Sequence, residues 1–189
     1  MLDQAISGGF ANPPVDAARV FRAVLNAMAR PGRIETVAPV AAPAPVSPAA
    51  AAVLLMLCDG ETPLFLAPGH DRPEIRDWIA FHIGAPIVAR GEAMFALGSW
   101  TELQPLADFR IGTAEYPDRS ATLIVEMEDL TAEGMRLTGP GIETEARLNL
   151  PDTAAFRANR ALFPLGLDFC FTAAERLAAL PRSTKVEAG

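Results

Sequence analysis

The stretch TLIVEM at residues 122–127 is a continuous, mostly apolar run of strand-forming residues. A run without alternation is typical of a strand that is buried on both faces of a sheet. Residues 165–171 predict a second buried strand, whereas residues 135–138 and 142–150 alternate apolar with polar side chains, as strands exposed on one face do. These segments predict a β-rich middle of the chain.

Helical periodicity lies on both sides of these strands. Residues 16–28 carry apolar side chains at helical spacing up to the stop signal Arg30-Pro31-Gly32. Further helices are expected at residues 48–57, 71–84, 100–107, 152–163 and 173–180, and further short strands at 33–38, 62–67, 86–89 and 93–97. This order predicts an α/β fold, a three-layer sandwich around a mixed sheet.

Length and composition predict one domain. The chain has 189 residues, of which 50% are hydrophobic and 21% charged, and this is enough apolar material for a sizeable core. We expect a single α/β domain over residues 1–189, with residues 1–14 and 183–189 as surface-wrapping or flexible tails.

The charge and hydropathy patterns argue against several partners. The 23 acidic residues outnumber the 16 basic ones, and the formal net charge is -7. Such a chain attracts neither nucleic acid nor an anionic membrane surface. No apolar stretch reaches the roughly 20 residues that cross a bilayer, and the N-terminus does not resemble a secretory leader. We therefore expect no nucleic acid, no membrane and a cytoplasmic location.

Motifs of common enzyme classes are missing. The sequence contains no GxxxxGK[ST], GxGxxG, GxSxG, HExxH or CxxC pattern, so a self-contained NTPase, dehydrogenase, hydrolase or zinc protease is not expected. Its histidines, His70 and His82, show no metal-ligand spacing, and no metal is expected. Cys58 and Cys170 lie in apolar segments, which predicts buried thiols.

His82 is the histidine with the clearer structural context. It follows Trp78 by one helical turn on an apolar face. This position favours a core histidine bonded to a backbone carbonyl, and a general base is the alternative. His70 is expected in a loop.

Two turn segments supply further candidates. Gly139 and Gly141 flank Pro140 between two strands, where a plain reversal is favoured over amides that face an anion. Asp59 and Gly60 follow a buried helix, where a turn at the helix end is favoured over a contact with a ligand.

The basic residues are almost all arginine. Lys185 is the single lysine, which leaves 16 − 1 = 15 arginines. A Schiff base with pyridoxal phosphate needs a lysine amine held in a pocket, and a tail residue does not supply one. We therefore expect no pyridoxal phosphate and no other cofactor.

Three arginines are candidate anion or interface residues. Arg22 and Arg30 lie eight residues apart on one expected helix, and Arg182 follows a proline near the C-terminus. The N–H donors of a guanidinium group match the oxygen atoms of phosphate, phosphonate and carboxylate groups alike. Pairing with carboxylates, within the chain or across an interface, is favoured over substrate binding.

A set of short segments, in this order, resembles the PhnH family of the bacterial carbon-phosphorus lyase system. The segments are FR at 21–22, NAMARPG at 26–32, LCDGETP at 57–63, WIAFH at 78–82, GPGI at 139–142, FPLGLD at 163–168 and LPRST at 180–184. No single segment is specific, but their order and spacing cover residues from about 10 to 185. The resemblance implies a domain similar to the core of pyridoxal-phosphate-dependent transferases without the cofactor lysine.

The resemblance also implies a function with partners. It implies a role, with carbon-phosphorus lyase subunits G, I, J and the ATP-binding-cassette-like L, in replacing the adenine of ATP by a phosphonate to form ribose 1-methylphosphonate 5-triphosphate. It further implies a homodimer in isolation, and ATP and phosphonate bound through the complex. It assigns no catalytic residues. The alternative is a stand-alone protein or enzyme that binds a phosphonate or nucleotide by itself.

Overall fold

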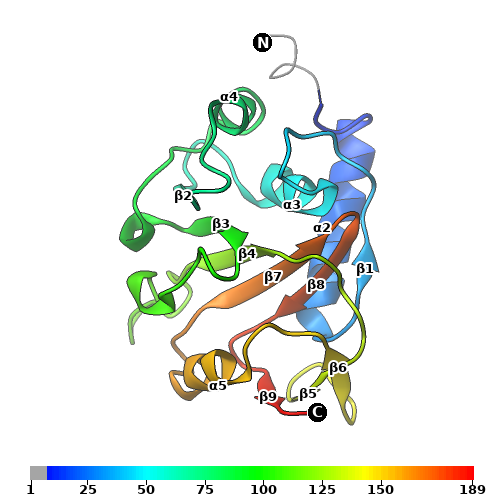
Figure 1. Ribbon diagram of the computed structural model, residues 1–189, viewed down its shortest axis with the longest axis vertical. Helices are drawn as coiled ribbons and strands as arrows, with labels where there is room; N and C mark the ends of the chain where they lie inside the picture. Colours follow the sequence, from blue (N-terminus) through cyan, green and yellow to red (C-terminus); the bar gives the residue numbers. More distant parts are fainter. Residues whose placement is uncertain (1–7) are drawn as a thin grey trace.

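The computed structural model describes residues 8–189, and a mixed sheet forms its centre. The strands span Glu35–Thr36 (β1), Leu64–Leu66 (β2), Phe95–Ser99 (β3), Thr122–Glu126 (β4), Asp168–Ala173 (β7) and Arg176–Leu180 (β8). They form one six-stranded sheet in the order β1-β8-β7-β4-β3-β2 (Figure 1). Strands β2, β3, β4 and β7 are parallel, while β8 and β1 are added antiparallel.

Strand β4 is buried on both faces, as its sequence predicts. Leu123 and Val125 belong to one hydrophobic cluster, and Ile124 between them belongs to another. Because successive side chains of a strand point to opposite faces, the two clusters lie on opposite sides of the sheet. Both faces are therefore covered.

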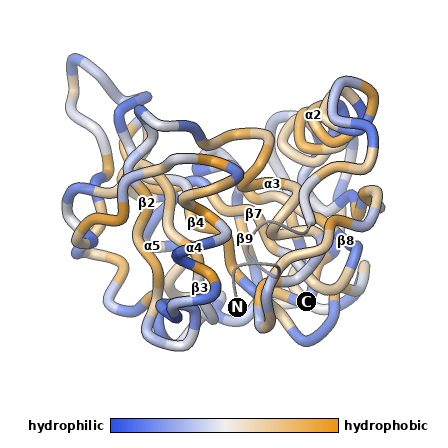
Figure 2. Tube along the Cα trace, turned by 90° about the horizontal axis from the view of Figure 1, so that it is seen from above, coloured by the Kyte–Doolittle hydropathy of each residue, from blue (hydrophilic) through white to orange (hydrophobic). Residues whose placement is uncertain are grey.

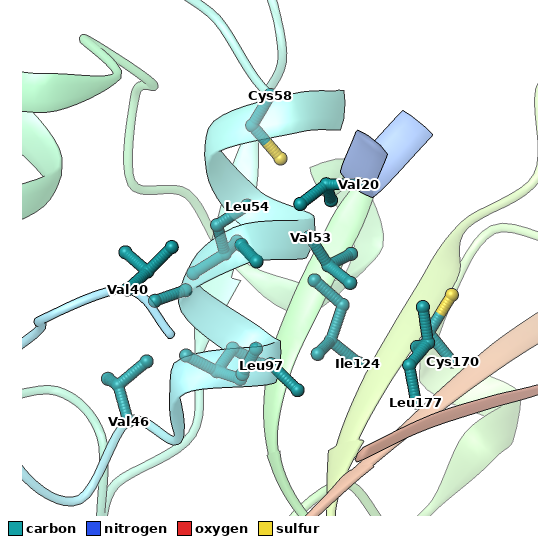
Figure 3. Close-up of a cluster of buried hydrophobic side chains, with 14 of the residues drawn as sticks. Val20, Val40, Val46, Val53, Leu54, Cys58, Leu97, Ile124, Cys170 and Leu177 are labelled. Atoms are coloured by element: carbon teal, nitrogen blue, oxygen red, sulfur yellow. The ribbon is translucent and has the colours of Figure 1, made fainter. Parts of the chain in front are cut away.

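Helices α2 (Pro13–Ala29), α3 (Pro48–Leu57) and α4 (Pro73–His82) supply side chains to the cluster on one face. Helix α3 begins where the sequence predicts, because the Ser47 hydroxyl accepts a hydrogen bond from the Ala50 amide at 3.1 Å. Figure 3 shows Val53 of this helix beside Ile124 of the sheet, and Leu54 on the side of the helix toward Val40. The all-round apolar sequence of α3 thus fits its buried position.

The other face is covered by α5 (Thr153–Ala161) and a small antiparallel sheet. The small sheet has the order β6-β5-β9, with β5 at Met135–Thr138, β6 at Ala146–Leu148 and β9 at Lys185–Glu187. Aromatic rings fill the space between the layers. The ring centroid of Phe156 lies 4.9 Å from that of Trp100 and 5.1 Å from that of Phe169. Such ring pairs stabilise a core beyond the area they bury.

The interior is apolar and contains both cysteines. In Figure 2 the hydrophobic colour follows α3, β4 and β7 through the middle of the view, and hydrophilic colour lies on outer loops. Cys58 and Cys170 are free and buried, as predicted, and burial raises the pKa of each thiol to about 12. No helix formed by residues 8–189 is long and apolar enough to cross a membrane.

The prediction of a helix at residues 173–180 is wrong. The chain turns at Ala174, whose φ is +49°, and returns as β8 beside β7. The alanine and leucine content favours a helix locally. In the fold, however, Leu177 and Ala178 reach opposite hydrophobic clusters, and only a strand places consecutive residues on both faces.

The prediction of a helix at residues 100–107 is also wrong. This segment forms turns and a short 3₁₀-helix, η2 (Leu106–Asp108). The Arg90 guanidinium donates hydrogen bonds to the carbonyl oxygens of Glu102 and Gln104 at 2.6 and 2.7 Å. A side chain from another segment therefore satisfies acceptors that a helix would use internally.

Several expected strands are shorter than predicted. Only Glu35–Thr36 pairs within residues 33–38, and only Ala146–Leu148 pairs within residues 142–150. The strand expected at residues 86–89 is reduced to a single bridge between Ile87 and Leu64.

The two segments expected as surface-wrapping or flexible tails are, taken together, only partly described. Residues 1–7 of the N-terminal segment lie outside the described residues, and after them Gly9 bridges to Ala41. Within residues 183–189, β9 pairs with β5 and its Val186 is buried. Lys185 thus lies in a regular strand, with its side chain exposed.

Candidate functional site

Except for Arg22, which lies within α2, the candidate residues separate into two regions at opposite ends of the molecule (Figure 1). We call one region the hairpin end; it comprises residues 29–32 at the C-terminal end of α2, the turn at residues 139–141, and residues 182–184. The other is the helix end, formed by the C-terminal ends of α3 and α4. Asp59 and His82 lie there.

At the hairpin end, backbone segments approach very closely. Gly141 has a φ of +82°, and a Cβ built on it would lie 1.9 Å from the carbonyl oxygen of Ala29. On the other side of the turn, a Cβ on Gly139 would lie 3.4 Å from the carbonyl oxygen of Ser183. The Ile142 amide bonds to the Gly139 carbonyl oxygen at 3.1 Å, so the segment is the tight reversal that its sequence favours.

Arg182 is bound by the chain itself. Its backbone amide and its Nε atom donate to Asp168, at 2.8 and 3.2 Å, and its Nη1 atom donates to the carbonyl oxygen of Pro117 at 2.7 Å. Its Nη2 atom contacts Asp168 and the Ser120 hydroxyl. The Arg182 and Asp168 side chains are 13% and 17% exposed. This geometry favours the intramolecular pairing over a contact with a ligand.

Arg22 and Arg30 have a different environment. Both are exposed, and the ion pairs within residues 8–189 include neither. Arg22 lines a groove of about 480 Å³ between α2 and β1. Phe21 and Leu25 on the same helix are also exposed, at 46% and 51%. The outer face of α2 thus combines free guanidinium groups with apolar side chains.

At the helix end, Asp59 organises a turn. Its Oδ1 atom accepts hydrogen bonds from the Thr62 hydroxyl at 2.7 Å and from the Glu61 amide at 2.9 Å. The hydrogen bond from Thr62 and then that from Glu61 lower the pKa of the Asp59 carboxyl. These contacts fit the helix-end turn that the sequence favours.

His82 lies between two aromatic rings. Its ring centroid is 5.1 Å from that of Trp78 and 4.9 Å from that of Phe81. The buried Nε2 atom has no hydrogen-bond partner among the described residues, and neither does Trp78 Nε1. The carbonyl contact expected for His82 is therefore absent in this part of the chain.

His70 lies in a loop, as expected, but it is deeply buried. The residue is 4% exposed, and its two ring nitrogens have no partner within residues 8–189. Burial lowers the pKa of the imidazole, and the nearby Glu102 carboxylate opposes this effect. Burial thus favours the neutral imidazole over the charged one at this site.

Glu126 is a half-buried acid that the sequence interpretation missed. It ends β4, and its carboxylate accepts hydrogen bonds from the Ser47 amide at 2.7 Å and the Thr172 hydroxyl at 2.9 Å. Burial raises the pKa of its carboxyl group. The signal in the sequence was a charged residue inside an otherwise apolar strand.

A hollow of about 440 Å³ opens beside Glu126 at the carboxyl ends of β3 and β4. Open parallel sheets commonly bind ligands at this edge. Here the lining includes Glu128 and Asp129 as well as Glu126. Of these acids only Asp129 forms an ion pair within residues 8–189, with Arg176 at 3.1 Å, so the acidic lining disfavours the triphosphate of ATP. No group of three or more His, Cys, Asp or Glu side chains within residues 8–189 is arranged to hold a metal ion.

Comparison with known proteins identifies the family. The family model described as bacterial phosphonate metabolism protein (PhnH) matches residues 8–187. The chain belongs to the PhnH family. It is 44% identical over 194 residues to the alpha-D-ribose 1-methylphosphonate 5-triphosphate synthase subunit PhnH of Rhizobium meliloti (strain 1021), covering 97% of this chain and 96% of that protein. The family predicted from the ordered segments is thus confirmed.

A shorter match points to the same system. The chain is 36% identical over 84 residues to the putative C-P lyase subunit protein HtxG of Stutzerimonas stutzeri, covering 41% of this chain and 43% of that protein. The PhnH match extends over the hairpin end and the helix end together, since both lie within residues 8–187.

Proposed function

We propose that this chain acts as the PhnH subunit of an alpha-D-ribose 1-methylphosphonate 5-triphosphate synthase in phosphonate degradation. The observation that carries the proposal is the 44% identity to the Rhizobium meliloti subunit over 97% of this chain. A match of this extent leaves no large segment of the domain outside the comparison. The activity of the relative is therefore the best guide to the reaction in which this chain takes part.

We also propose that the chain needs partner subunits for turnover. Displacing adenine from ATP by a phosphonate requires a site that binds a triphosphate, aligns a phosphonate oxygen and stabilises the leaving base. The hollow beside Glu126 is acidic, and Arg182 is occupied by Asp168. These observations support a co-catalytic or non-catalytic subunit.

The outer face of α2 is our proposed contact surface for the partners. The exposed Phe21 and Leu25 side chains, with Arg22 between them, provide the apolar area and the cationic group that interfaces commonly use. We propose the lyase subunits G, I, J and L as partners, and a homodimer when they are absent. A Phe21→Ser variant should lose co-purification with the partners, whereas Met94→Ser, at an exposed apolar residue outside α2, should keep it.

We also propose that the fold of this domain resembles the core of pyridoxal-phosphate-dependent transferases. The mixed sheet with helices on both faces supports it, and binding of the cofactor is not proposed. Lys185, the single lysine, is exposed on β9. We expect the purified protein to show no absorption band of an internal aldimine. A band that disappears in Lys185→Ala would contradict this prediction.

Reconstitution tests the proposed function. Release of adenine from ATP plus methylphosphonate is measured with the chain alone, with the partner subunits alone, and with all subunits together. We expect release only from the complete mixture. Turnover by the isolated chain would make it an enzyme in its own right, and undiminished turnover without it would show that it is dispensable.

A stand-alone binding protein is the second candidate, and the groove beside Arg22 favours it. Calorimetry of the isolated chain with ATP separates the two candidates. Strong binding that Arg22→Ala removes would support the stand-alone protein, whereas the subunit proposal expects little heat until the partners are present.

A further inference from the structure

A small basic hollow lies on the loop between η2 and β4. It has a volume of about 290 Å³ and is lined by Arg110, Ile111, Gly112, Thr113, Tyr116 and Arg119. None of the sequence candidates lies in it. In a chain of net charge -7, both charged residues that line this hollow are arginines.

Both arginines of the hollow are free of carboxylates. Seven arginines form ion pairs within residues 8–189, and neither Arg110 nor Arg119 is among them. Glu115 and Asp118 on the same loop do not pair with them either. The Arg119 guanidinium lies instead over the Tyr116 ring, 4.0 Å from its centroid. Stacking of this kind orients a guanidinium while leaving its N–H groups free at the edge.

The loop is fixed before any ligand arrives. The Thr113 amide donates to the Tyr116 carbonyl oxygen at 3.1 Å, and the Tyr116 amide donates to the Thr113 hydroxyl at 3.0 Å. Gly112 has a φ of +83°, and a Cβ on it would lie 2.5 Å from the carbonyl oxygen of Pro117. The backbone of the loop is therefore held in one arrangement.

Arg182 anchors this loop from the protein interior. Its guanidinium bonds the Pro117 carbonyl oxygen and contacts the Ser120 hydroxyl, while Asp168 neutralises its charge. Arg182 thus acts as a positioning residue for the hollow, and its side chain is not part of the lining. A loop held in place by a buried ion pair loses less entropy when it binds a ligand.

We propose that this hollow binds a small tetrahedral oxyanion of the phosphate or phosphonate class. Arginine is the preferred side chain for such groups because its N–H donors match two oxygens at once. The volume suits a phosphonate or inorganic phosphate and is too small to enclose a whole nucleotide. The choice of an organic phosphonate as the natural ligand rests on the proposed function, whereas the oxyanion class rests on the arginines alone.

Calorimetric titration of the full chain with methylphosphonate, inorganic phosphate and ATP tests the proposal. We expect binding of methylphosphonate and phosphate, weakened about tenfold by either Arg110→Gln or Arg119→Gln, because each substitution removes charge-assisted hydrogen bonds. Arg72→Gln, at an exposed and unpaired arginine outside the hollow, should leave binding unchanged. Thermal melts of the variants establish that each is folded.

The following outcomes would overturn the proposal of an oxyanion site. Failure of the wild-type chain to bind either small oxyanion, or equal loss in Arg72→Gln, would show that the hollow is not an oxyanion site. Preference for ATP over both small anions would assign the arginines to a nucleotide. If adenine release by the reconstituted mixture needs the chain but the chain binds no oxyanion, the inference fails and the proposed function stands. If the chain binds an oxyanion but adenine release does not need the chain, the proposed function fails and the oxyanion site stands.

Discussion

The hairpin end and the helix end contain comparable sequence signals, but they use their polar groups in different ways. At the hairpin end, Gly141 touches the backbone of α2 and Arg182 is enclosed by Asp168 and two loop acceptors. At the helix end, His82 and Trp78 each bury a ring nitrogen that has no partner among the described residues. At the first end the polar groups are therefore bound by the chain, whereas at the second end these two buried ring nitrogens add no hydrogen bond to the fold within the described residues.

The largest expected effect is that of Gly141→Ala at the hairpin end. The new Cβ would meet the Ala29 carbonyl oxygen at 1.9 Å, and the positive φ adds strain to any residue with a side chain. We expect a loss of about 4 kcal/mol in the free energy of unfolding, measured by urea denaturation.

Gly60→Ala at the helix end is the matched control. A Cβ there would lie 3.8 Å from its nearest neighbour, the carbonyl oxygen of Gly84, which is an ordinary contact. Its unfolding free energy should change by no more than about 0.5 kcal/mol. Equal losses in the two variants would remove the distinction between the ends.

Arg182→Ala is expected to have the next largest effect. It leaves Asp168 partly buried without its partner and releases the carbonyl oxygen of Pro117. We expect a loss of about 3 kcal/mol in urea denaturation. Arg30→Ala, at the exposed arginine of the same end, should lose almost nothing. A small effect of Arg182→Ala would show that its hydrogen bonds are replaced by water.

The outcome for these arginines shows what the sequence alone can predict. Buried strands such as residues 122–127 and the cap at Ser47 follow from local patterns, and they were predicted correctly. The sequence around Arg22, Arg30 and Arg182 does not show which of them is paired. Whether an arginine forms an ion pair depends on residues far away in the chain: Asp168 and Ser120 lie 14 and 62 positions from Arg182. No local pattern distinguishes a paired arginine from a free one.

The dependence on residues distant in the sequence also explains the other errors of the sequence-based predictions. The segment at residues 173–180 became β8 because its pairing with β7 outweighs its helical propensity. The arginines of the basic hollow, Arg110 and Arg119, are nine positions apart and match no motif. Only the folded loop, closed by the contacts between Thr113 and Tyr116, brings them to one hollow.

A smaller effect should appear in the pH dependence of stability. Burial lowers the pKa of His70 from its ordinary 6.5, so the folded state takes up a proton less readily than the unfolded chain. The free energy of unfolding should therefore be constant above pH 7 and fall as the pH drops below 6.5 towards the folded pKa, by at most about 1.4 kcal/mol per pH unit.

Denaturation of wild type and His70→Gln between about pH 7.5 and about pH 5, a range that brackets the ordinary histidine pKa, measures the contribution of His70. The variant should lose most of the slope. Glu102 and Arg72 face the same site, and the hydrogen bond from the Ser99 hydroxyl lowers the pKa of the Glu102 carboxyl, away from this range. An unchanged slope in His70→Gln would assign the pH dependence to other groups.

The smallest expected effect is at His82, and it tests the helix end directly. Its buried Nε2 atom has no hydrogen-bond partner among the described residues, so removing the atom removes a desolvation cost and breaks no bond. We expect His82→Leu to change the free energy of unfolding by less than about 1 kcal/mol, in either direction. If the same variant nevertheless abolishes adenine release in the reconstituted mixture, the loss is functional, because the fold is intact. A large loss of stability would instead place His82 with Arg182 among the residues that hold the fold together, and the contrast between the two ends would no longer stand.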